Sequence, residues 1–135
     1  MFQPKRHRIA FTTLALLCLT GPNSSYAYWN PSLPEVMKLP PYCKAQFRPD
    51  IFKGPEYAFP PCGGWFNHYC PGLAALNQAS NPALSPSERR FMLSEARGHI
   101  RYTVHNLDKA PPNCPLKPML DLAQQRIRML DASLK

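Results

Sequence analysis

The sequence contains no run of about 20 consecutive apolar residues, the length that a helix needs to cross a lipid bilayer. A shorter apolar segment, Ile9–Leu19, lies between a basic start and the small residues of Ser25-Tyr26-Ala27. The basic residues are Lys5, Arg6 and Arg8. This order is typical of a secretory signal peptide. We therefore expect residues 1–27 to be removed before Tyr28, and the mature protein to be periplasmic or secreted.

Acidic residues are scarce, with 8 Asp and Glu against 16 Lys and Arg in the whole chain. Without residues 1–27, 108 residues with a net charge of +5 remain, which is enough for one small domain. A positive surface favours an anionic partner, such as an acidic protein surface, cell-wall polymer or the lipid headgroups that a peripheral membrane protein contacts. Nucleic acid is not expected as a partner in this compartment.

The sequence features of several enzyme classes are missing. There is no Gly-x-Ser-x-Gly motif for a nucleophilic serine, and no Cys-x-x-Cys-His motif for haem attachment. Glycan cleavage needs a pair of carboxylates, but Glu88 is expected in a helix cap and Glu95 on a helix surface. We therefore expect a protein that is not an enzyme and that has no cofactor.

Cysteines are few, and they are even in number once Cys18 has left with the leader. The remaining four are Cys43, Cys62, Cys70 and Cys114. In an exported chain they predict two disulfides, for which three pairings are possible. Three helices joined by short links run up, down and up, which brings together the residues that precede the first and third helices. This topology favours Cys62–Cys114 and leaves Cys43–Cys70 as the other pair.

Residues 28–64 contain too many prolines for a helix of normal length or for a central strand. These prolines are Pro31, Pro34, Pro40, Pro41, Pro49, Pro55, Pro60 and Pro61. Aromatic residues lie between them, and a disordered linker would be poor in aromatic residues. We expect an irregular or polyproline-like arm, pinned by disulfides, whose rings fill grooves of the domain. The alternative is that the arm is a proline-rich ligand for a partner.

Apolar residues at three- and four-residue spacing predict a first helix over roughly Trp65–Ala79. Pro71 removes a backbone donor, so this helix must begin near Cys70 or have a kinked first turn. His68 falls beside Gly72 on the face of small residues. We expect its imidazole to form a hydrogen bond with the arm or with the next helix.

Two further helices complete the domain of residues 65–135. Ser85-Pro86-Ser87-Glu88 is typical of a capped helix start, and Pro111 requires that this second helix end before it. His99 borders the buried stripe of the second helix, and the sequence identifies no partner for it. An amphipathic pattern predicts a third helix from about Pro118 to Ser133. No segment alternates with a period of two, so we expect an all-α, three-helix domain.

One cluster could hold a metal ion. Cys62, His68 and Cys70 offer two thiols and an imidazole, which suit copper or zinc, and Met37 or Met92 could assist copper. However, seven residues separate the two cysteines, whereas structural zinc sites usually have two to four. Disulfides are therefore the first interpretation, and the metal site is the alternative.

Arg90, Arg97 and Arg101 lie on one side of the second helix, and Glu95 lies on the other. Like charges four residues apart destabilise an isolated helix slightly, and the core is expected to need none of these arginines. A solvated basic face would explain the pattern. The functional interpretation is that the three guanidinium groups bind the carboxylates of an acidic partner.

Three segments together resemble one protein family. They are Pro41-Tyr42-Cys43, His68-Tyr69-Cys70-Pro71-Gly72-Leu73, and Ala96–Ile100. Across residues 39–107 the chain resembles small exported bacterial proteins with tetratricopeptide-like helices, whose repeats are helix–turn–helix units of about 34 residues. The resemblance implies a tetratricopeptide-like hairpin followed by a C-terminal helix, and a binding module rather than a catalyst.

These observations lead to one expected function and two alternatives. We expect a non-catalytic accessory or scaffold subunit that mediates a protein–protein interaction in an envelope complex. The first alternative is a small periplasmic protein that handles copper or zinc with His68 and unpaired cysteines. The second is a secreted inhibitor, because small disulfide-stapled folds often serve that purpose.

Overall fold

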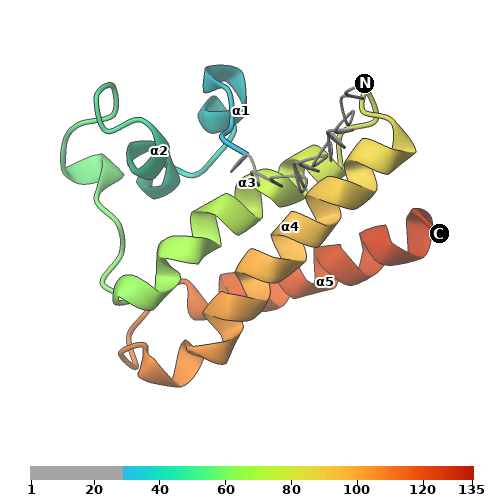
Figure 1. Ribbon diagram of the computed structural model, residues 1–135. Coiled ribbons are helices and arrows are strands. Elements are labelled where there is room, and N and C mark those ends of the chain that lie inside the picture. Colours follow the sequence, from blue (N-terminus) through green and yellow to red (C-terminus); the bar gives the residue numbers. More distant parts are fainter. Residues whose placement is uncertain (1–28) are drawn as a thin grey trace, which may run out of the picture.

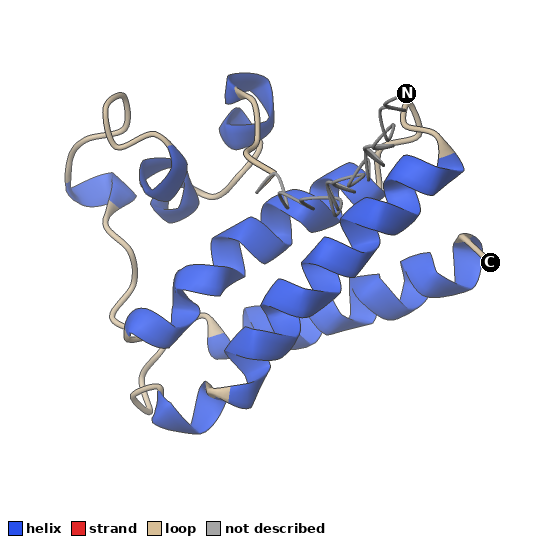
Figure 2. Cartoon of the chain, in the orientation of Figure 1, coloured by secondary structure: helices blue, strands red, loops and turns tan. Residues whose placement is uncertain are grey.

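The computed structural model describes residues 29–135, which form helices and loops without any strand (Figure 2). In chain order the elements are α1 (Leu33–Met37), α2 (Pro41–Phe47), the 3-10 turn η1 (Pro55–Tyr57), η2 (Gly64–His68), α3 (Tyr69–Ala79), α4 (Pro86–His105), η3 (Leu107–Lys109) and α5 (Lys117–Ser133). The all-α prediction is confirmed. The count of three helices is wrong, because the arm adds α1 and α2. The predicted signal peptide and its cleavage site before Tyr28 lie outside the described residues.

The three long helices α3, α4 and α5 pack side by side, and consecutive helices run in opposite directions (Figure 1). Helix α4 contacts both of the others, and its contact with α3 is the most extensive. Phe66, Leu76, Ile100 and Leu120 are the largest apolar side chains that are almost wholly buried between them. Each contributes about 1.5–3 kcal/mol relative to an exposed position.

Helix α4 begins with the predicted capping box. The backbone N–H of Glu88 donates to Ser85 Oγ at 3.3 Å, and the backbone N–H of Ser85 donates to Glu88 Oε2 at 2.8 Å. These two bonds satisfy amides that have no partner within the helix. The cap serine's hydroxyl and backbone N–H hold the pKa of the Glu88 carboxyl below its usual value. The helix ends at His105, before Pro111 as predicted.

Helix α3 begins at Tyr69, in agreement with a start near Cys70. The preceding residues of the predicted Trp65–Ala79 helix form the 3-10 turn η2 instead. Pro71 therefore lies in the first turn of α3, where its missing N–H would have no partner within the helix. The C-terminal helix α5 spans Lys117–Ser133, which agrees with the prediction to within one residue.

The arm is more regular than predicted. Pro34 occupies the first turn of α1 and Pro41 begins α2, so both prolines start helices instead of preventing them. The arm also buries apolar side chains, because Val36 is 0% exposed and Leu39 is 3% exposed. The prediction of an irregular or polyproline-like arm is therefore wrong for α1 and α2. The prediction that the arm packs over the domain is confirmed.

Two cysteine pairs lie at disulfide distance. Cys43 and Cys70 join α2 to α3, with Cα atoms 5.3 Å apart. Cys62 and Cys114 join the loop before η2 to the loop before α5, with Cα atoms 4.8 Å apart. These are the favoured pairs, and the up-down-up topology does bring the starts of α3 and α5 together. The pairs are compatible with an oxidising compartment.

None of the helices in residues 29–135 combines the length and the apolar character that crossing a bilayer requires.

Candidate functional site

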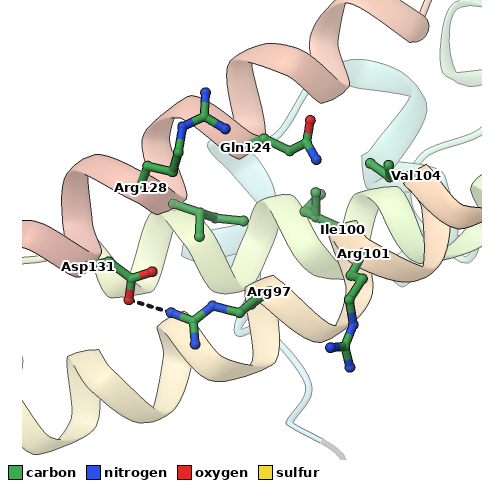
Figure 3. Close-up of a pocket in the computed structure, with 8 residues that line it drawn as sticks. Arg97, Ile100, Arg101, Val104, Gln124, Arg128 and Asp131 are labelled. Atoms are coloured by element: carbon green, nitrogen blue, oxygen red, sulfur yellow. Dashed lines mark hydrogen bonds and ion pairs between the residues drawn. The ribbon is translucent and has the colours of Figure 1, made fainter.

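A groove between α4 and α5 is the strongest candidate for a functional site (Figure 3). Its cavity volume is about 290 Å³. The groove has a largely apolar floor and a polar, charged rim, and its lining residues are Arg97, Ile100, Arg101, Val104, Gln124, Ile127, Arg128 and Asp131. An apolar surface with a few polar groups at its edge is the usual composition of a binding site.

The floor of the groove is formed by apolar residues that also pack α4 against α5. Ile100 of α4 and Ile127 of α5 are 1% and 7% exposed, and they belong to the hydrophobic core. Val104 lies one turn after Ile100 and is half-buried. Because the floor is part of the core, a ligand would meet a rigid apolar surface rather than a mobile loop.

The three arginines that were predicted to form one contact surface do not all lie at the groove. Arg97 and Arg101 line the groove, but Arg90 does not. Arg90 Nη1 instead approaches the carbonyl oxygen of Leu134 at 3.5 Å, near the end of α5. The third arginine at the groove is Arg128, which belongs to α5. Sequence reasoning missed Arg128 because the pattern of one helix does not show which residues of another helix lie beside it.

Arg97 forms an ion pair with Asp131 that crosses from α4 to α5 (Figure 3). Arg97 thus has a partner on the neighbouring helix, although the pair lies at the surface and outside the hydrophobic core. Both side chains of the pair are nearly half exposed, so its contribution to stability is about 0–1 kcal/mol. The pair also neutralises one of the three guanidinium groups at the groove.

Two guanidinium groups remain unneutralised at the rim. Among the described residues the ion pairs are Arg48–Asp50 and Arg97–Asp131, and neither involves Arg101 or Arg128. Both of these arginines are exposed, one on each side of the groove (Figure 3). A guanidinium group presents a planar fork of donors that matches a carboxylate. The arrangement can therefore bind an acidic group beside an apolar one.

A second cavity lies in the arm, and its lining carries no charge. Its volume is about 310 Å³, and its lining includes Tyr42, Tyr57 and Phe59 together with Gln46 and Asn67. The rings of Tyr42 and Phe59 meet edge to face, with centroids 5.8 Å apart. Gln46 Nε2 donates to the carbonyl oxygen of Asn67 at 2.6 Å, which links α2 to η2. The cavity can hold a neutral apolar or aromatic group.

The metal site proposed for Cys62, His68 and Cys70 does not form. The two cysteines belong to different disulfides, so neither can supply a thiolate. Nowhere in residues 29–135 does a group of three or more His, Cys, Asp or Glu side chains gather in a way that could hold a metal ion. His68 does bond to the next helix as predicted, and its partner there is His99.

Comparison of the chain with protein-family models, with curated proteins and with solved structures finds no match. The resemblance to tetratricopeptide-like exported proteins therefore stays a prediction. The geometry of the groove is the basis on which a function can be argued.

Proposed function

We propose that this protein is a non-catalytic accessory subunit, exported to the cell envelope, that docks through the α4–α5 groove on an acidic segment of another envelope protein. The observation that carries the proposal is the pair Arg101 and Arg128, whose unneutralised charges flank the apolar floor at Ile100 and Ile127. The partner segment should carry an apolar anchor side chain with Asp or Glu residues beside it.

Charge complementarity supports an acidic partner in particular. The mature chain has a net charge of +5, so an acidic protein is attracted from a distance before any contact forms. At the groove, the guanidinium forks then fix the orientation of the carboxylates. Because both arginines are exposed, salt screens this attraction, and docking should weaken as ionic strength rises.

A protein segment fits the groove better than a lipid does. Gln124 offers both a donor and an acceptor to a peptide backbone. A cavity of about 290 Å³ is at the lower end of ligand sites, which suits one or two anchor side chains.

Site-specific photo-crosslinking in living cells tests the proposal. A photoreactive amino acid at Val104, in the floor, should crosslink to a segment of an envelope protein that mass spectrometry identifies as acidic with an apolar anchor. The same amino acid at Phe91, which is exposed on α4 outside the groove, is the position control. It should give none of that product.

Charge variants complete the experiment. Arg101→Gln combined with Arg128→Gln should reduce the Val104 crosslink strongly. Lys38→Gln combined with Lys53→Gln removes the same charge from exposed positions on the arm, and this matched control should not reduce it. Equal losses in both double variants, or a crosslink to lipid or to a segment without acidic residues, would refute the proposal.

A further inference from the structure

Two histidines meet where η2 runs into α3 and packs against α4. His68 Nδ1 lies 2.8 Å from His99 Nδ1, and the centroids of the two rings are 5.0 Å apart. The ring of Tyr102 packs on the ring of His68, with centroids 4.1 Å apart. Both imidazoles are half-buried, so solvent and small ions can reach the pair.

The close approach of α3 and α4 creates this contact. A Cβ atom added to Gly72 would lie 2.9 Å from Ile100 Cδ1 and 3.1 Å from His99 Cβ. The missing side chain therefore allows α3 to approach α4 beside His99. On the other side, the disulfide of Cys70 anchors α3 two residues after His68. The fold thus holds the backbones of both histidines in place.

We infer that His68 and His99 form a binding site for Cu(II), in which the protein supplies two nitrogen ligands and water supplies the others. The two Nδ1 atoms are 2.8 Å apart, so one ion can contact both once the rings turn. Imidazole nitrogen is a ligand that suits copper. Cu(II) is also the divalent first-row ion that such ligands bind most strongly.

Copper binding requires both Nδ1 atoms to present a lone pair. In the hydrogen bond between the rings, one Nδ1 carries a proton and the other accepts it. On binding, the shared proton leaves for solvent while Nε2 of the same ring takes one up, so both imidazoles stay neutral. Each ring then turns until its Nδ1 lone pair points at the ion.

The surroundings of the pair favour a cation. Glu95 lies one helical turn before His99 on α4, and both residues line the same small cavity. The carboxylate adds negative charge beside the site without being needed as a ligand. This site belongs to the α3–α4 side of the molecule, so it is independent of the groove between α4 and α5.

Titration of the mature, oxidised protein with CuCl2 tests the inference, in a preparation without a polyhistidine tag. His68→Gln and His99→Gln should each weaken Cu(II) binding at least about tenfold, because losing even an outer hydrogen-bond partner of a metal ligand typically costs about 10–100-fold. His105→Gln is the matched control, because His105 is exposed near the end of α4 and does not line the pair. It should leave binding unchanged.

A measurement on the unaltered protein guards against variants that fold poorly. In NMR spectra, small amounts of Cu(II) should broaden the ring signals of His68 and His99 while those of His105 persist. The inference is overturned if the His68 and His99 variants bind copper as the unaltered protein does. It is also overturned if His105→Gln loses as much affinity, or if copper broadens the three histidines alike.

Discussion

Replacing Gly72 by alanine should destabilise the protein, although alanine favours helices. The new Cβ would lie 2.9 Å from Ile100 Cδ1, 3.0 Å from Ile100 Cγ1 and 3.1 Å from His99 Cβ. Ile100 is 1% exposed and has little room to move, and His99 Cβ is fixed to the backbone of α4. Overpacking of this kind costs about 1–3 kcal/mol. Replacing glycine by alanine within a helix stabilises the helix by about 1 kcal/mol. We therefore expect the free energy of unfolding to fall by about 1 kcal/mol in total.

Gly98→Ala is the matched control on α4. Nothing lies within 4 Å of a Cβ at Gly98. Alanine there therefore stabilises the helix without overpacking any neighbour. It should stabilise the protein by about 0.5–1 kcal/mol. The helix preference is common to both variants, so the difference between them isolates the packing cost of about 1–3 kcal/mol.

Urea denaturation followed by circular dichroism measures both free energies of unfolding. In thermal unfolding each kcal/mol should shift the Tm by about 4 °C for a domain of this size. The two variants should therefore move the Tm in opposite directions. Shifts of the same sign and size would show that α3 and α4 do not approach each other as closely as Gly72 indicates.

Three other perturbations have defined outcomes. Ser85→Ala removes the cap of α4 and should lower the free energy of unfolding by about 1 kcal/mol in urea denaturation, whereas Ser94→Ala, exposed within the same helix, should not lower it. Burial raises the pKa of Tyr69 above its usual value, so the unfolded chain loses this proton first as the pH rises past about 10. Stability should therefore fall with rising pH there, and Tyr69→Phe should fall less steeply. Replacing Cys62 and Cys114 by alanine frees a loop of 52 residues and should lower the free energy of unfolding by about 4 kcal/mol, which urea denaturation with the slope fitted separately for each protein measures. A loss well below 1 kcal/mol would contradict that pairing.

The long helices were predictable because their information is local. Ser85 and Glu88 form the cap that their spacing indicates, and the apolar stripe of α5 faces the core as its period predicts. Pro34 and Pro41 misled the prediction for the arm. A proline forbids the interior of a helix but is suited to its first turn, and sequence spacing alone does not distinguish the two in helices of five to seven residues.

The sequence by itself determined the helical class, the starts of α4 and α5, and a topology that favours Cys62–Cys114. Each of these depends on residues close in the chain or on the order of elements. Only the tertiary structure decided that Arg97 pairs with Asp131, that Arg128 joins Arg101 at one groove, and that His68 meets His99. The physical reason is that such contacts depend on the rotation and the separation of neighbouring helices. Those quantities are set by side-chain packing at sites such as Gly72, and the period of a single helix does not contain them.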